Sequence, residues 1–228
     1  MVVRQEVRAV QAVSALVNAV LARRTGHPPA MALLVGLSGI DGSGKGYLAG
    51  HLVTALTVCG LKTAAINVDG WLNLPTVRFD ALQPGENFYE NALRLDELFL
   101  RLVSPLREKR SARVTMDWVE EAATASRPYT YDFDNLDVIV LEGVYLFKRA
   151  YRRHFDLAVW VDCSWETALE RSVARSQEGL PPEETVRAYR TIFFPAEEIH
   201  FARDTPRESA DMIVPNDSQL WERKAAGA

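Results

Sequence analysis

Short runs rich in hydrophobic residues recur along the chain, the best four of them continuous, and they predict the strands of a buried sheet. The clearest run covers residues 138–141, and the others cover residues 33–38, 63–68, 112–116, 157–161 and 212–214. Helical patterns lie between most of these runs, at residues 45–58, 91–103, 165–177 and from 181 onward. Buried strands that alternate with helices are typical of a parallel sheet covered on both faces, so we predict an α/β fold.

The first residues of the chain carry a different pattern. Apolar residues recur there at helical spacing, at Val10, Val13, Leu16, Val17, Val20 and Leu21. Polar residues interrupt the segment, which makes it too short and too polar for a membrane span and unlike a signal peptide. We therefore expect an amphipathic helix packed on the core (residues 1–28), a main domain (29–220) and a frayed tail (221–228). A homo-oligomer formed through this helix is a hypothesis only.

Composition limits the partners and the location. The chain has 228 residues, of which 48% are hydrophobic and 25% charged, and its net charge is −4. These values suit one folded soluble domain and indicate neither a nucleic-acid nor a membrane partner. Cys59 and Cys163 show no spacing typical of disulfide frameworks or metal sites, so we expect two buried free thiols and a reducing, cytoplasmic location.

A glycine-rich stretch after the run at residues 33–38 carries the strongest chemical signal. Its sequence is Gly39-Ile40-Asp41-Gly42-Ser43-Gly44-Lys45, and a predicted helix begins at its end. Glycines let such a loop turn its backbone N–H groups toward phosphate oxygens, while the lysine reaches the outer phosphates. The positive end of the following helix adds to the attraction. We predict that a nucleoside triphosphate binds here, at Gly39, Asp41, Gly42, Ser43, Gly44, Lys45, Gly46 and Tyr47.

The loop departs from the usual pattern at one position. The residue after the lysine is usually Ser or Thr, whose hydroxyl binds Mg²⁺, but here it is Gly46. One interpretation is that water, Ser43 or Asp69 replaces this ligand. The other is that metal binding, and with it turnover, is weakened.

Three carboxylates follow predicted strands. In open α/β sheets, ligands bind beyond the carboxyl ends of the strands, where Asp69, Glu142 and Asp162 lie. Asp69 is placed to accept a proton from a hydroxyl or to hold a metal ion, and Glu142 is placed to hold Mg²⁺ through water. For Asp162 the expected role is to cap the next helix.

Together these segments resemble the uridine kinase, phosphoribulokinase and bacterial pantothenate kinase branch of the P-loop kinases. The resemblance covers residues 33–217 and rests on the glycine-rich loop and on the segments at 68–71, 140–147, 155–162, 188–195 and 210–216. It implies a three-layer fold with a parallel sheet of about five strands and a helical lid at residues 165–195. The implied cofactors are ATP or GTP and Mg²⁺.

The resemblance also implies roles for single residues. Asp69 would act as the catalytic base, and Lys45 would hold the phosphates. Arg171 and Arg175 would lie in the lid and offset the charge on the transferring phosphoryl group. Taken alone, the two arginines lie four residues apart on one helix, where a solvated ion-pair face is an equally open interpretation.

By the same resemblance, the acceptor site lies within residues 71–131. Aromatic residues there could stack on a base or a sugar, and arginines could hold an anionic group, although a packing or surface role is open for each. The acceptor stays open between a nucleoside, another sugar, a pantothenate-like acid and some other small molecule. The candidate residues are Trp71, Arg78, Phe79, Tyr89, Arg94, Asp117, Arg127 and Tyr129.

These observations favour an ATP-dependent kinase that transfers a γ-phosphate to a hydroxyl of a small metabolite, with a nucleoside as the first candidate. The alternative is a nucleotide-binding regulatory or partner module with weak catalysis, and Gly46 is the residue that favours it. A P-loop hydrolase coupled to motion is a third hypothesis, which the short chain does not favour.

Overall fold

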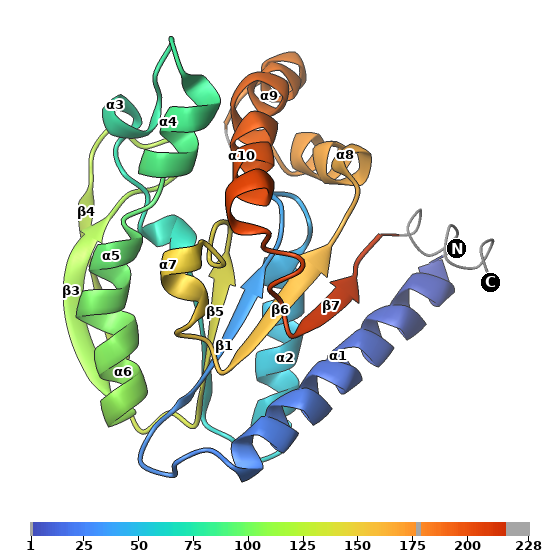
Figure 1. The fold of residues 1–228 in the computed structure, drawn as a ribbon, viewed down its shortest axis with the longest axis vertical. Coiled ribbons are helices and arrows are strands. Elements are labelled where there is room, and N and C mark those ends of the chain that lie inside the picture. The colour runs from blue at the N-terminus through green and yellow to red at the C-terminus, as the bar shows by residue number, and fades with distance from the viewer. Residues whose placement is uncertain (1, 177–178, 218–228) are drawn as a thin grey trace.

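Five parallel strands form the centre of the computed structural model, which describes residues 2–176 and 179–217 (Figure 1). Their spatial order is β2-β5-β1-β6-β7, with bounds Thr63–Asn67, Val138–Gly143, Leu33–Ser38, Leu157–Asp162 and Met212–Pro215. Every neighbouring pair in this sheet is parallel. The predicted five-stranded parallel sheet is confirmed, while the predicted tail at residues 221–228 lies outside the described residues.

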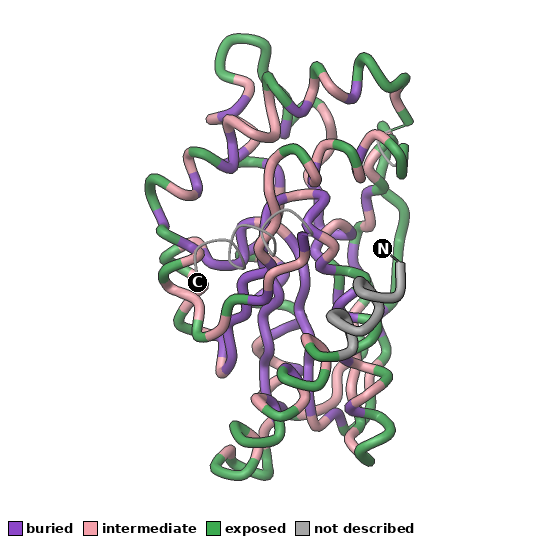
Figure 2. Tube along the Cα trace, turned by 90° about the vertical axis from the view of Figure 1, so that its right-hand side faces the viewer, coloured by how far each residue is buried: buried purple, intermediate pink, exposed green. Residues whose placement is uncertain are grey.

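The central strands are buried on both faces, which explains their uninterrupted apolar sequence. Every residue of β1 and β5 is buried. Figure 2 shows that buried residues fill the interior of the molecule. Because successive side chains point to opposite faces, Leu33 and Val35 pack in one core cluster with helices α1 (Val2–Thr25) and α2 (Lys45–Val58). Leu34 packs in a second cluster, under the helices of the other layer.

That other layer combines helices from distant parts of the chain, and α10 lies beside α4 in it (Figure 1). A short 3₁₀ turn, η1 (Val68–Gly70), follows β2. The remaining helical segments are α3 (Pro75–Arg78), α4 (Pro84–Asn91), α5 (Leu95–Leu98), η2 (Phe99–Val103), α6 (Ser104–Lys109), α7 (Arg149–Arg152), α8 (Trp165–Arg175), α9 (Pro182–Ala188), η3 (Tyr189–Phe193) and α10 (Phe194–Asp204).

One predicted strand has a different place from the one its sequence suggests. The run at residues 112–116 is a strand, β3 (Ala112–Trp118), but it does not join the central sheet. It pairs in antiparallel fashion with β4 (Arg127–Phe133) as a separate two-stranded sheet at the edge of the molecule (Figure 1). β4 was not predicted because most of its side chains are exposed and its sequence carries no apolar run.

Two η segments are turns of π-helix, in which the backbone bonds skip one residue more than in an α-helix. The segment η3 continues α9 into α10, and η2 joins α5 to α6. Such turns are frequent at functional sites because they reorient the side chains around them. Here η3 contributes Tyr189 and Phe193 to the site described below.

Further expectations were met or corrected by the structure. Leu16 and Val20 of α1 are fully buried against α2, as an amphipathic helix requires.

Both cysteines are free thiols, but Cys59 is exposed at the end of α2 and Cys163 is only half-buried, so the expectation of two buried thiols was wrong. Within residues 2–176 and 179–217, no helix is both long and apolar enough to cross a bilayer.

Candidate active site

The glycine-rich loop lies between β1 and α2 and has a backbone that only glycine adopts easily. Gly42 and Gly44 have φ angles of 75° and 88°. A Cβ atom on Gly42 would lie 2.4 Å from the carbonyl oxygen of Ala168, and one on Gly44 would lie 2.4 Å from Nδ2 of Asn216. Both positions therefore require glycine, for conformation and for space. The loop is held in a single shape by its neighbours.

The loop and the start of α2 present the groups that bind phosphate. Lys45 is buried, and its Nζ donates to the carbonyl oxygen of Ile40 at 2.9 Å, a contact that phosphate oxygens could replace. The first N–H groups of α2 have no acceptor within the helix and carry its positive dipole. Ser43 adds a buried hydroxyl that has no hydrogen-bond partner within the described parts of the chain. These groups fit the phosphates of a nucleotide.

Gly46 lies beside a carboxylate. A Cβ atom at Gly46 would lie 3.4 Å from Oε1 of Glu142, which is an ordinary contact, so a serine has room there. Glu142 is buried, and burial together with the charges of Asp69 and Asp41 raises its pKa to about 7, with Lys45 opposing.

Few other groups are available for a metal ion. Among the described residues, no three His, Cys, Asp or Glu side chains gather as a metal site. The residues fit Mg²⁺ only if Glu142 supplies a ligand and the remaining ligands come from phosphate oxygens and water. Glu142 would then replace the missing Ser or Thr hydroxyl as a metal ligand.

Asp41 connects the loop to the lid helices. Arg175 of α8 lies 3.1 Å from Oδ2 of Asp41, and the hydroxyl of Tyr189 in η3 donates to the same carboxylate. Burial alone would raise the pKa of Asp41, but the charges of Arg175 and Lys45 and the hydrogen bond from Tyr189 hold it below its usual value. Two segments of the predicted lid therefore dock on the phosphate loop through one side chain.

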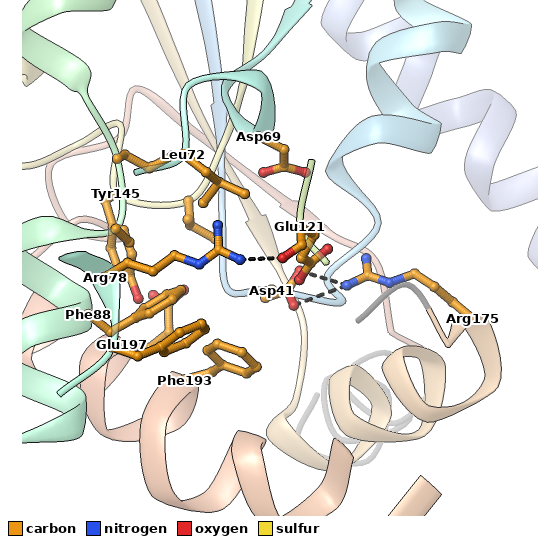
Figure 3. A pocket seen from close by; sticks show the side chains of 14 residues that line it. Asp41, Asp69, Leu72, Arg78, Phe88, Glu121, Tyr145, Arg175, Phe193 and Glu197 are labelled. Atoms are coloured by element: carbon orange, nitrogen blue, oxygen red, sulfur yellow. Dashed lines mark hydrogen bonds and ion pairs between the residues drawn. The ribbon is translucent and has the colours of Figure 1, made fainter. Parts of the chain in front are cut away.

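Arg171 occupies a different place from Arg175. Its Nη1 lies 3.3 Å from the carbonyl oxygen of Ser43, and its Nη2 donates to the carbonyl oxygen of Asn216 at 2.9 Å. Asn216 in turn donates to the oxygen of Ser43 at 2.7 Å. Arg171 thus braces the outer side of the phosphate loop, whereas Arg175 faces the site through Asp41 (Figure 3).

Asp69 lies at the carboxyl end of β2, in the turn η1. Oδ1 of Asn67 accepts the backbone N–H of Asp69 at 2.6 Å, which fixes the turn. Burial, with the charge of Asp41, raises the pKa of Asp69, while Lys45 opposes the shift. A carboxylate that is less well solvated than usual is a stronger proton acceptor at neutral pH.

The expected capping role of Asp162 was wrong. The residue that caps α8 is Ser164, whose Oγ accepts the N–H of Thr167 at 3.2 Å. Asp162 instead binds the guanidinium of Arg207, with 3.2 Å between Oδ2 and Nη2. The reason is that residue 164 directly precedes the helix, as a capping residue must.

A cavity that is partly open to solvent is lined at one end by Asp41 and Asp69 (Figure 3). One side of it carries aromatic rings: Phe79 stacks on Phe88 with centroids 5.7 Å apart, and Phe193 meets Phe88 edge-on at 4.9 Å. The complete lining is Asp41, Asp69, Leu72, Arg78, Phe79, Phe88, Ala92, Leu93, Glu121, Val144, Tyr145, Arg175, Phe193 and Glu197.

Two of the predicted acceptor residues, Arg78 and Phe79, line this cavity. Arg78 is almost fully buried, and its terminal nitrogens donate to the carbonyl oxygens of Asn73, at 3.0 Å, and Glu121. Its guanidinium also lies over the ring of Phe79, at 5.0 Å. Arg78 therefore shapes the wall of the cavity with two of its five donors used by backbone carbonyl oxygens.

The other predicted acceptor residues lie outside the cavity lining. Trp71 is buried and stacks on Tyr131, and the guanidinium of Arg94 lies 5.6 Å from its ring. The hydroxyl of Tyr89 donates to Asp204 at 2.6 Å. Three more are in or near the β3–β4 sheet: Asp117 accepts from Arg94 through its backbone, Arg127 pairs with Glu120, and Tyr129 packs on Trp118. Tyr47 is exposed at the start of α2 and packs on His51.

Sequence reasoning missed several residues of the cavity, among them the glutamates Glu121 and Glu197. Tyr145, Phe193 and Glu197 come from the loop after β5, from η3 and from α10. Tyr145 has a φ of 59°, which is uncommon outside glycine and is a signal of strain that only coordinates reveal. No short motif marks α10, because its place beside the site depends on tertiary packing.

The comparisons with known proteins begin with sequence. No family model matches the chain. The uridine kinase of Saccharomyces cerevisiae is 24% identical over 190 residues, a match that covers 80% of this chain and 36% of that protein. The chain therefore spans little more than a third of that relative's length.

Solved structures agree with this fold. A possible uridine kinase from Bacillus stearothermophilus has a TM-score of 0.71 at 20% identity, with 93% of this chain and 99% of that chain covered. A protein proposed to be a fructose transport system kinase, from Silicibacter sp. TM1040, has a TM-score of 0.68 at 24% identity, with 88% and 98% covered. D-glycerate 3-kinase from Cryptococcus neoformans has a TM-score of 0.56 at 15% identity, with 82% of this chain and 87% of that chain covered.

These relatives carry kinase names, and the likeness extends over most of the chain. The parallel sheet of five strands, the glycine-rich loop after β1 and the flanking helices have the places that the resemblance implies. The fold of this chain is therefore the fold of these P-loop kinases.

Proposed function

We propose that this protein is a phosphotransferase that moves the γ-phosphate of ATP onto a hydroxyl of a small metabolite. The observation that carries the proposal is the position of Asp69. It lies at the junction of two spaces, with the phosphate loop on one side and the cavity lined by Phe79 and Phe193 on the other. A hydroxyl held in that cavity beside Asp69 faces the end of a triphosphate held by the loop.

The chain's residues then divide the work. The loop amides and Lys45 hold the phosphates, so that the terminal phosphorus lies in line with the acceptor oxygen. Asp69 takes the proton as the oxygen attacks. Arg175, already at the loop through Asp41, adds positive charge near the transferring group. Mg²⁺, held in part by Glu142, would neutralise charge on the phosphates.

The alternative function is a nucleotide-binding module with weak catalysis. Gly46 favours it, because the hydroxyl that usually binds the metal is absent. The aromatic cavity beside Asp69 favours the kinase, since a nucleotide sensor has no need for a second buried space next to its phosphate loop.

The test is diphosphate release, measured with ATP or GTP, Mg²⁺ and a panel of possible acceptors. The panel contains uridine, cytidine, D-fructose, D-glycerate and pantothenate. Release that depends on one acceptor would support the kinase and identify its class of acceptor. Measurable ATP binding without acceptor-dependent release across the panel would contradict the kinase proposal and favour the binding module.

A further inference from the structure

Glu197 lines the acceptor cavity and is an unusual residue for a buried wall. It comes from the first turn of α10, and only 2% of its surface is exposed. No hydrogen bond of ordinary geometry reaches either carboxyl oxygen within the described parts of the chain, although the backbone N–H of Asp41 lies close enough to act on the pKa of the group. A buried polar group without a partner is costly, so each one calls for an explanation. For Glu197, whose side chain lines the cavity, a polar group of the bound acceptor supplies that partner.

The surroundings of Glu197 show why it stays unpaired. The cationic groups of the cavity have other partners: Arg78 donates to the carbonyl oxygens of Asn73 and Glu121, and Arg175 pairs with Asp41. Burial, with the charge of Asp41, raises the pKa of Glu197 to about 8, while Lys45 opposes the shift. Near neutral pH its carboxyl group is mostly protonated and offers one donor and one acceptor.

The remaining lining selects for an uncharged ligand. Asp41 and Asp69 contribute negative charge at the phosphate end of the cavity, and aromatic rings form its side. Arg175 is paired with Asp41, and Arg78 lies on the wall with two of its donors on backbone carbonyl oxygens. Even with Glu197 neutral, the acidic lining residues Asp41, Asp69 and Glu121 outnumber the two arginines. A carboxylate or phosphate on the acceptor would therefore meet net negative charge in a largely buried space, which is unfavourable.

We propose that Glu197 is a specificity-determining residue, which hydrogen-bonds a polar group of an uncharged acceptor while the aromatic rings cover the acceptor's apolar face. This inference rests on the proposed function in that the cavity is the acceptor site. It adds the residue that hydrogen-bonds the acceptor and the class of acceptor, anionic molecules, that binds poorly.

The experiment measures binding by calorimetry, with uridine, D-fructose, D-glycerate and pantothenate as probes, in the presence of Mg²⁺ and ADP. Two variants separate hydrogen bonding from bulk: Glu197→Gln keeps both a donor and an acceptor, and Glu197→Leu keeps neither. Glu198→Leu is the matched control, because Glu198 is the exposed neighbour on the same helix.

We expect uridine or D-fructose to bind the wild type at least roughly tenfold more tightly than D-glycerate and pantothenate. Glu197→Leu should lower the affinity for that neutral probe by roughly tenfold or more, because a hydrogen bond in a buried site is lost. Glu197→Gln should stay within about threefold of the wild type. The affinity for ADP should be the same in all variants, which a general loss of structure would not allow.

Four results would overturn the inference. They are an anionic probe that binds the wild type more tightly, an unchanged neutral probe in Glu197→Leu, an equal loss of ADP affinity, and no binding by either neutral probe. Failure of the proposed function is separate from all four. If uridine binds through Glu197 but accepts no phosphate, the kinase proposal fails and the inference stands. If the protein phosphorylates pantothenate, the kinase proposal stands and the inference fails.

Discussion

At the scale of single residues, the site combines a loop and strand-end carboxylates that the sequence indicates with a buried glutamate, Glu197, that it does not. The glycines of the phosphate loop are recognisable because Gly42 and Gly44 must adopt positive φ angles between a strand and a helix. Glu197 carries no such mark. It is one of two adjacent glutamates in α10, and only the packing of that helix buries it and exposes Glu198. Sequence alone could not separate the two.

The raised pKa of Glu197 has a consequence for stability that can be measured. An unfolded glutamate has a pKa near 4.3, so between there and about 8 the folded protein holds a proton that the unfolded chain releases. The contribution of Glu197 to the free energy of unfolding is therefore fully present below the unfolded pKa. It is lost as pH rises toward 8, by up to ~1.4 kcal/mol per pH unit. Glu197→Gln should remove this loss.

The measurement is urea unfolding of the wild type and Glu197→Gln at several pH values between 5.5 and 8. As pH rises, the free energy of unfolding of the variant should increase relative to that of the wild type by roughly 1 kcal/mol per pH unit. Glu198→Gln, at the exposed neighbour, should follow the wild type. Parallel curves for the wild type and Glu197→Gln would show that the carboxyl group has an ordinary pKa.

Gly46 is the residue at which the loop differs most from its pattern. The structure leaves room for Gly46→Ser, and serine is a better helix former than glycine, so the variant should be as stable as the wild type or more stable by about 0.5 kcal/mol. Because Glu142 already lies beside the position, we expect turnover to change by less than roughly tenfold. Steady-state kinetics at varied Mg²⁺ measures this, and a much larger gain would indicate a decayed metal site.

At the scale of elements, the strands of the sheet were predictable and the small sheet was not. β1 and β5 are buried on both faces, so their sequences are apolar throughout and differ from any exposed segment. β4 has four exposed residues in succession, because its sheet covers only one side of the molecule's edge. Candidates such as Arg127 and Tyr129 belong to this edge, which is why residues from the expected acceptor region lie outside the cavity.

The lid elements dock on the phosphate loop through Asp41, and Tyr189 is the contact from η3. Tyr189→Phe removes a hydrogen bond to a charged, half-buried carboxylate, so it should lower the free energy of unfolding by about 1.5 kcal/mol. Tyr129→Phe changes a half-exposed hydroxyl on β4 and should cost less than about 0.5 kcal/mol. Urea unfolding of both variants is the measurement. Equal effects would show that the contact between Tyr189 and Asp41 does not hold the lid in solution.

At the scale of the whole molecule, function follows from where the sheet ends and the helices cover it. The carboxyl ends of parallel strands bring together groups that are far apart in sequence: the loop after β1, Asp69 after β2 and Glu142 in β5. The helices α4 and α10 then enclose a cavity beside them. The sheet and the loop could be predicted because they depend on local pattern, whereas the cavity depends on contacts between distant segments.

The most direct test of the central claim is phosphoryl transfer by Asp69→Asn, measured with the acceptor that gives the highest release in the panel. Asparagine has the same shape but cannot take the proton, so transfer should fall by at least roughly a hundredfold. The dissociation constant for ATP should change by less than about twofold, since the loop and Lys45 are untouched. Near-normal turnover in this variant would contradict the account, because another group would then be the base.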